Sequence, residues 1–196
     1  MKDSKSRLFD KKKINLLIAG ILSILILNPS NVNAKLVAYS IGTKYNDGIN
    51  TIQDAKNASE AYYSTGQYSS FYNGKPTYDY LTGANPNTNV PRMESEIIFF
   101  SGHGDYDHMP FNYEGKGGEY ATGIYLGYTG ATASGGYKFA GVKSFNMNKV
   151  GMAVYAGCNT GKEGVTNIAE VTFTSGATVS MGGGDMKLQQ VLTQIG

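Results

Sequence analysis

The chain has 196 residues, 41% of them hydrophobic, which excludes wholesale disorder and leaves room for one domain rather than two. The formal net charge is +2, but six of the 17 basic and two of the 15 acidic residues precede residue 14. The remaining 11 basic and 13 acidic residues give the rest of the chain a net charge of −2. This balance excludes the basic surface that a nucleic-acid partner requires.

The first 34 residues have the pattern of an export signal. Three lysines precede an apolar run over residues 14–27, and Val32-Asn33-Ala34 places small residues at the positions that signal peptidase reads. The run is shorter than the roughly 20 residues that a membrane-spanning helix needs, although an uncleaved N-terminal anchor is the alternative. We predict cleavage after Ala34 and a secreted chain of residues 35–196, with no membrane contact beyond the signal.

The first half of this secreted chain has the pattern of alternating strands and helices. An apolar run predicts a strand over residues 36–41, and apolar positions three and four apart predict a helix between residues 47 and 66. Either Asp47 or Asn50-Thr51 can cap its start, and Gly66 can end it. A short strand near residues 68–72 and a helical turn near 76–81 follow. The clearest strand, at residues 96–101, is a bounded apolar run rich in β-forming residues.

The second half begins with a segment rich in glycine and tyrosine, which predicts loops and one or two hairpins. The elements expected there are hairpin strands at 124–128 and 137–140, a helical turn at 144–149, a strand at 150–156, a helix at 164–174 and a strand at 177–181. Residues 182–196 are polar, with a weak helical pattern. Apolar strands separated by helix-compatible segments predict an α/β fold with a mostly parallel sheet flanked by helices.

Two segments place a reactive side chain just after a buried strand, at residues 97–108 and 152–161. His103 lies between two glycines, and Cys158, the sole cysteine, lies in a glycine-flanked turn. Open α/β sheets place their active sites at the carboxyl ends of the strands. If the two strands are neighbours, His103 and Cys158 converge and can act as a proton donor and a thiolate nucleophile. An inert buried thiol is the alternative interpretation of Cys158.

These motifs, Ser-Gly-His-Gly at 101–104 and Ala-Gly-Cys-Asn-Thr-Gly at 156–161, resemble those of the caspase-like cysteine peptidases. The match is closest to the bacterial CHAT-domain and clostripain-like members, and it covers about residues 36–181. The resemblance implies a caspase-like sandwich, a mostly parallel sheet flanked by helices, over residues 35–196. It also implies a protein or peptide substrate.

The resemblance further implies a role for each motif residue. Cys158 would be the nucleophile, and His103 the general acid and base. The backbone N–H groups of Gly104 and Cys158 would form the oxyanion hole, since two aimed N–H groups stabilise a developing oxyanion. The family usually has no strict third member beside this dyad. Its chemistry uses neither a metal nor an organic cofactor.

The chain departs from the family pattern at two points. Ala156-Gly157 precede the cysteine, so no substrate preference transfers from the family. Only 38 residues follow Cys158, whereas family domains usually continue through a further strand and loop, so we expect a domain that is incomplete at its C-terminus. The predicted function is a secreted cysteine endopeptidase with a His–Cys dyad. The alternative is a secreted, non-catalytic or truncated caspase-like module that binds a protein partner.

A third interpretation concerns the segment His-Gly-Asp-Tyr-Asp-His at 103–108, which resembles the zinc-binding box of metallo-β-lactamase-type hydrolases. Asp105 replaces the central histidine of that box, and the chain has only two histidines. Zinc hydrolysis is therefore the least favoured function. We expect Asp105, Asp107 and His108 to lie in a solvated loop, with contact to substrate or calcium as an open option.

Overall fold

The computed structural model describes residues 36–84, 89–130 and 136–183. All of these residues belong to the unit Lys35–Gly196. The expected export signal, its cleavage site after Ala34 and the weak helical pattern after residue 183 lie outside the described residues. In the three described ranges, no helix is long and apolar enough to cross a membrane.

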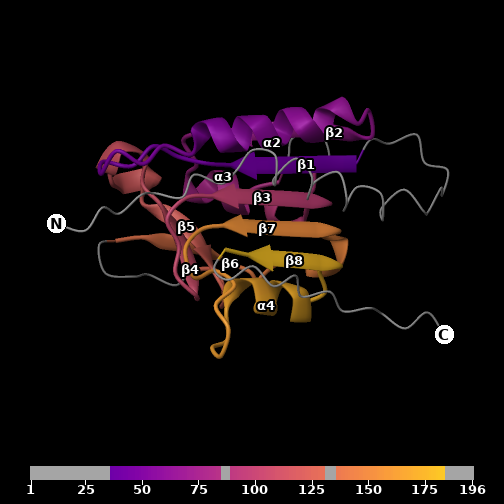
Figure 1. Ribbon diagram of the computed structural model, residues 1–196. Helices are drawn as coiled ribbons and strands as arrows, with labels where there is room; N and C mark the ends of the chain where they lie inside the picture. Colours follow the sequence, from indigo (N-terminus) through magenta and orange to yellow (C-terminus); the bar gives the residue numbers. More distant parts are fainter. Residues whose placement is uncertain (1–35, 85–88, 131–135, 184–196) are drawn as a thin grey trace. The chain divides into compact units, whose positions relative to one another are not determined.

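Five parallel strands form the main sheet, in the order β2-β1-β3-β7-β8 (Figure 1). Their bounds are Leu36–Ile41 (β1), Tyr68–Asn73 (β2), Ile97–Ser101 (β3), Met152–Ala156 (β7) and Val179–Gly182 (β8). Each strand runs parallel to its neighbours, so the carboxyl ends of the strands share one edge, toward which the arrows of β1, β3, β7 and β8 point in Figure 1. The predicted α/β fold with a parallel sheet is confirmed.

Three α-helices lie within the described ranges: α2 (Ile52–Ser64), α3 (Tyr78–Thr82) and α4 (Ile168–Thr174). Helix α2 contacts β1, β2 and β3, and α4 contacts β7 and β8. The crossovers from β1 to β2 and from β7 to β8 run in opposite directions across the sheet. Because such crossovers are right-handed, α2 and α4 cover opposite faces of the sheet.

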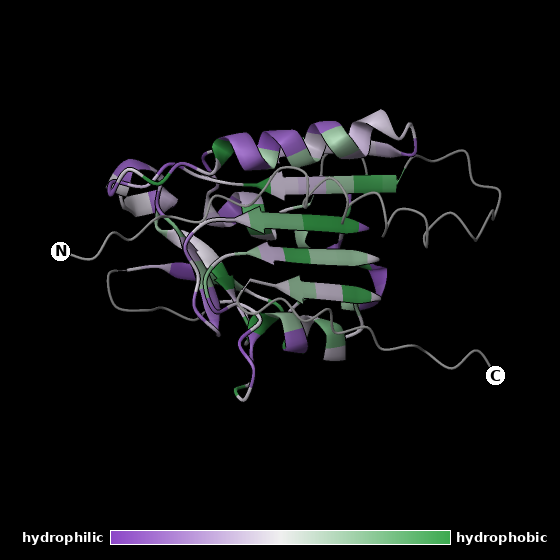
Figure 2. Ribbon diagram, in the orientation of Figure 1, coloured by the Kyte–Doolittle hydropathy of each residue, from purple (hydrophilic) through white to green (hydrophobic). Residues whose placement is uncertain are grey.

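The centre of the sheet is buried on both faces, as parallel sheets are. Residues 97–101 of β3 are all buried, and in Figure 2 the apolar colouring runs along β3 and β7. The rings of Phe100 and Tyr155, on paired positions of these two strands, stack with centroids 5.7 Å apart. The main core cluster lies on the face of the sheet that carries Phe100 and Tyr155. It also includes Ile98 and Ala153 from the strands and Leu81, Ile168, Ala169 and Val171 from the helices.

Helix α2 begins directly after Thr51, at the second of its two predicted caps, whereas α4 begins later than its sequence pattern predicts. Residues 43–51 pair with themselves instead of entering α2: the Thr51 N–H donates to the Thr43 carbonyl at 2.9 Å, and the Tyr45 N–H to the Ile49 carbonyl at 2.8 Å. At α4, the side chain of Asn167 accepts a hydrogen bond from the Glu170 N–H at 2.9 Å and so caps the helix three residues past Gly164. Local hydrogen bonds therefore decide where each of the two helices begins.

A second, three-stranded sheet follows β3, with β4 (His108–Phe111), β5 (Thr122–Tyr125) and β6 (Lys138–Gly141). Strand β4 was not predicted. It pairs antiparallel with β5, whereas β5 and β6 run parallel, so a hairpin between residues 124–128 and 137–140 is wrong. Met109, Phe111 and Ile124 are fully buried and join the main core, which holds this small sheet against the rest of the domain.

The remaining described elements are single turns of 3-10 helix. They are η1 (Arg92–Glu94), η2 (Tyr113–Gly115), η3 (Gly118–Tyr120) and η4 (Met147–Lys149). The last of these lies within the helical turn expected at residues 144–149. Helix α3 and strand β8 each lie one or two residues past their expected positions.

Candidate functional site

The turns that carry His103 and Cys158 lie against each other at the carboxyl edge of the main sheet. Strands β3 and β7 are neighbours, with Ser101 paired to Ala156, and the Gly102 N–H donates to the Ala156 carbonyl at 3.2 Å. A Cβ placed on Gly104 would lie 3.1 Å from the Cys158 carbonyl oxygen. The fold thus brings the two sequence motifs together, as neighbouring strands require.

Glycine is needed at this junction because two backbones approach closely. A Cβ on Gly104 would come within 2.8 Å of the Thr160 Cγ2, and one on Gly157 within 2.9 Å of the Met109 Cε. A Cβ on Gly157 would also lie 3.2 Å from the Gly104 Cα. The glycines that flank the two reactive residues therefore allow the contact between the turns.

Cys158 is exposed, so the alternative of an inert buried thiol is wrong for this position. The next residue, Asn159, has a φ of 56°, a left-handed conformation that asparagine tolerates better than most residues. Its side chain lies 3.5 Å from the Asp105 carboxylate, across the junction. The thiol therefore lies on a tight turn that faces solvent.

The buried side chain of Thr160 holds that turn against the ends of β7 and β8. Its Oγ1 lies 2.8 Å from the carbonyl oxygen of Tyr155 and 3.0 Å from that of Gly157. The same hydroxyl accepts a hydrogen bond from the Gly183 N–H at 2.7 Å. The end of β7, the turn of Cys158 and the end of β8 are thereby joined through one side chain.

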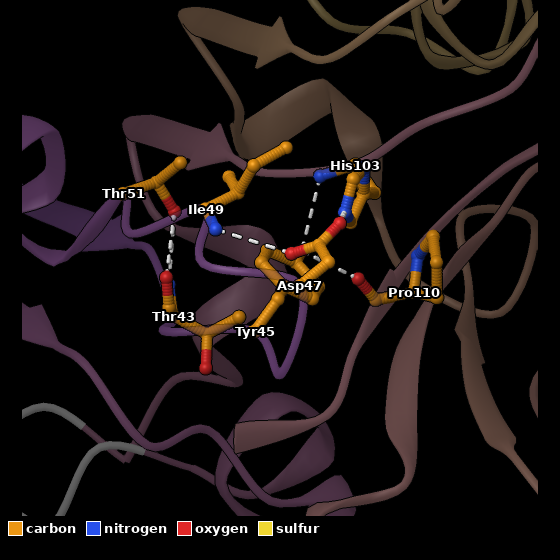
Figure 3. Close-up of polar contacts among 7 residues, drawn as sticks. All are labelled: Thr43, Tyr45, Asp47, Ile49, Thr51, His103 and Pro110. Atoms are coloured by element: carbon orange, nitrogen blue, oxygen red, sulfur yellow. Dashed lines mark hydrogen bonds and ion pairs between the residues drawn. The ribbon is translucent and has the colours of Figure 1, made fainter. Parts of the chain in front are cut away.

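The imidazole of His103 is held by Asp47, a residue that the sequence analysis did not assign to the site. The Nε2 of His103 lies 2.7 Å from the Oδ2 of Asp47, on the turn that follows β1 (Figure 3). The other carboxylate oxygen accepts the Ile49 N–H at 3.1 Å. That backbone hydrogen bond, together with the hydrogen bond from His103, holds the pKa of Asp47 below its usual range.

The side chain of Tyr45 binds the backbone of the same histidine. Its Oη accepts the His103 N–H at 3.1 Å and donates to the Pro110 carbonyl at 2.8 Å (Figure 3). The tyrosine ring meets the imidazole edge-on, with centroids 4.4 Å apart. Burial raises the pKa of the Tyr45 hydroxyl, so it stays protonated and keeps its donor. A Cβ on Gly102 would collide with this hydroxyl, which explains the first glycine of the Gly-His-Gly motif.

The segment 103–108 does not gather its side chains around a common point. The Nδ1 of His108 lies 2.6 Å from the Oδ1 of Asp107, and its ring packs edge-on against Phe139 in the small sheet. His103 instead contacts Asp47. Over the described ranges, no three histidine, cysteine or carboxylate side chains are placed to hold a metal ion.

No family model, no curated protein and no solved structure matches the chain. The functional interpretation therefore depends on the two motifs and on the geometry of the turns that carry them.

Proposed function

We propose that the protein is a secreted cysteine endopeptidase of the caspase-like type, with Cys158 as nucleophile and His103 as general acid and base. The observation that carries this proposal is the junction of two glycine-framed turns at the carboxyl ends of β3 and β7. One turn presents the sole thiol to solvent, and the other presents an imidazole held by a carboxylate. A cysteine with an oriented histidine is the arrangement that nucleophilic catalysis by a thiolate needs.

The proposed reaction proceeds in two steps. The Cys158 sulfur attacks the peptide carbonyl, and the N–H groups of Gly104 and Cys158 stabilise the oxyanion that forms. His103, which has taken the thiol proton, gives it to the departing amine as the C–N bond breaks. Water, deprotonated by His103, then attacks the thioester and releases the carboxylic acid and the thiol. Each proton and bond is accounted for without a metal or an organic cofactor.

The order of the strands supports the caspase-like assignment. The histidine turn follows β3, the cysteine turn follows β7, and these two strands lie side by side within one parallel sheet. Active sites in sheets of this kind lie at the carboxyl edge of the strands. The proposal takes a protein or peptide as substrate and no nucleic acid, consistent with the charge of −2 beyond the N-terminal lysines.

A non-catalytic module that binds a protein partner is the second candidate. The exposed aromatic side chains favour it: Tyr72 of β2 is 47% exposed, and Tyr128 is 69% exposed. Exposed tyrosines offer both apolar area and a polar tip to a partner. This candidate and the peptidase differ in the reactivity of Cys158.

The deciding experiment labels the purified protein with peptidyl acyloxymethyl ketones that carry Arg, Lys, Asp or Leu next to the warhead. Mass spectrometry then identifies the adduct. We expect an adduct on Cys158 that disappears in His103→Ala, and the preferred peptide reports the specificity. A folded protein that forms no adduct with any of the four would contradict the peptidase and favour the binding module.

A further inference from the structure

We propose that Asp47 is a positioning residue that fixes the tautomer of His103, so that Nδ1 is the nitrogen that exchanges protons with Cys158 and with the substrate. This inference rests on the proposed function. It adds a third residue to a dyad, from a turn that neither sequence motif includes.

The hydrogen-bonding capacity of each group decides the tautomer of His103. An ionised carboxylate only accepts hydrogen bonds, so the 2.7 Å contact between Asp47 and the Nε2 of His103 requires a hydrogen on Nε2. In a neutral imidazole the other nitrogen then carries the free lone pair. Within the described part of the chain, Nδ1 of His103 has no hydrogen-bond partner. The nitrogen that can accept the thiol proton is therefore Nδ1.

Asp47 is itself held in place, although its side chain is 48% exposed. Its Oδ1 is bound by the Ile49 N–H, and the turn is closed by the hydrogen bond from the Tyr45 N–H to the Ile49 carbonyl. The far end of the turn is tied to β3, because the Thr51 hydroxyl donates to the Ser101 carbonyl at 2.7 Å. The carboxylate thus belongs to a closed turn that is joined to the strand preceding His103.

Tyr45 completes the support from the other side of the histidine. It binds the backbone N–H of His103 and packs against the ring, while Asp47 binds the ring nitrogen. The backbone, the ring plane and one ring nitrogen are therefore all fixed by residues 45–47. A general base that is held in this way needs little reorganisation when the proton is transferred.

The proton path follows from this arrangement. The thiol proton of Cys158 moves to Nδ1, and the positive charge on the ring is stabilised by the carboxylate on Nε2. Asp47 accepts no proton at any step. When the substrate C–N bond breaks, the Nδ1 proton passes to the amine and the ring returns to the neutral Nε2–H tautomer.

The chain offers a matched control for this proposal. His108 and Asp107 form a pair of nearly the same length, 2.6 Å, through Nδ1 instead of Nε2, and this pair takes no part in the junction of the two turns. Asp107→Asn removes a carboxylate–imidazole contact of the same kind. The test therefore compares Asp47→Ala and the isosteric Asp47→Asn with Asp107→Asn, His103→Ala and the unchanged protein.

The first measurement is the tautomer of His103 in the full chain labelled with ¹⁵N-histidine. Only two histidines are present, so His108→Ala assigns the spectrum. We expect the Nε2–H form for His103, its replacement by a mixture of tautomers in Asp47→Ala, and no change in Asp107→Asn. The Nδ1–H form, or a mixture in the unchanged protein, would overturn the proposal.

The second measurement is the kinetics of Cys158 labelling by the acyloxymethyl ketone that reacts best. We expect Asp47→Ala to lower the maximal rate about 100-fold with its half-saturating concentration unchanged, because misplaced catalytic groups cost rate rather than binding. Asp107→Asn should label at the original rate. If Asp47→Ala and Asp47→Asn both label at the original rate while His103→Ala does not, this proposal fails and the peptidase stands. Labelling of no variant would overturn the peptidase, and the tautomer measurement would still decide what Asp47 does to the ring.

Discussion

Two histidines of this protein contact a carboxylate at nearly the same distance, His103 through Nε2 and His108 through Nδ1. The nitrogen–oxygen distance is 2.7 Å for His103 and Asp47 and 2.6 Å for His108 and Asp107, and all four side chains are between 32% and 48% exposed. The partners of the first pair are 56 residues apart, whereas those of the second are adjacent in sequence. Adjacent residues can meet in many folds, but a contact over 56 residues exists only because β1 and β3 are neighbours.

The comparison therefore shows that a short histidine–carboxylate contact does not by itself mark a site. His108 begins β4 and packs on Phe139, so its pair belongs to the edge of the small sheet. His103 follows β3 beside the turn of Cys158. The placement at the carboxyl edge of the main sheet, next to a thiol, distinguishes the first pair from the second.

The largest effect is expected for Cys158→Ala, which removes the proposed nucleophile beside the His103–Asp47 pair. Peptide cleavage and labelling should be lost completely. The circular dichroism spectrum and thermal transition should stay unchanged, because the side chain is exposed and fills no core space. Cleavage that survives in this variant would show that the thiol is not the nucleophile.

The next effect separates the two histidines directly. His103→Ala should lower the rate of cleavage by about 10²–10⁴-fold, the usual contribution of an acid–base group. His108→Ala should leave the rate unchanged. Steady-state kinetics on the same peptide compares both variants, and an equal loss of rate in the two would show that the histidines do not differ in role.

A smaller effect tests what holds the turn of Cys158 beside the first pair. Thr160→Val removes the buried hydroxyl, leaves the carbonyls of Tyr155 and Gly157 without that donor, and should cost roughly 1–3 kcal/mol of stability. Thr160→Ser keeps the hydroxyl and loses only a methyl group, a cost of about 0.8 kcal/mol. Urea unfolding measures both. A valine variant as stable as the serine variant would refute the anchoring role of the hydroxyl.

The smallest effect is the pH dependence that Asp47 contributes. Since its pKa is lowered in the folded protein, its stabilising hydrogen bonds are fully present above the unfolded pKa and are lost as the pH falls through the folded pKa. The stability difference between the unchanged protein and Asp47→Asn should thus be present above the unfolded pKa of Asp47 and shrink as the pH falls through its folded pKa. Urea unfolding at neutral and at acidic pH measures this difference. A difference that grows in acid would contradict the sign.

The parts of the fold that the sequence predicted are those marked by local composition. Strand β3 and strand β7 are apolar runs that end at glycines, and both the buried strands and the close approach of the two turns follow from that pattern. His103 and Cys158 could be named because each follows such a strand directly. Parallel neighbours then required the two turns to meet at one edge.

The parts that were missed depend on contacts between distant residues. Asp47 precedes a helical pattern, where its sequence context made it one of two possible helix caps. Its actual partner is decided by the pairing of β1 with β3. Strand β4 has only four residues, too few to show an alternating pattern, and one of them is Pro110, a residue that argues against a strand. The parallel pairing of β5 and β6 likewise leaves no local signal.

The strand order also bears on when the reactive site can exist during folding. Ala38 pairs with Ile97, and Ile97 with Met152, so both strand pairs around the site close long loops, and such non-local contacts form slowly. Asp47, His103 and Cys158 come together only after both pairs have formed. During the export that we propose, the unfolded chain therefore carries a thiol without its base. Accelerated reactivity of Cys158 would appear at the end of folding, on the far side of the membrane.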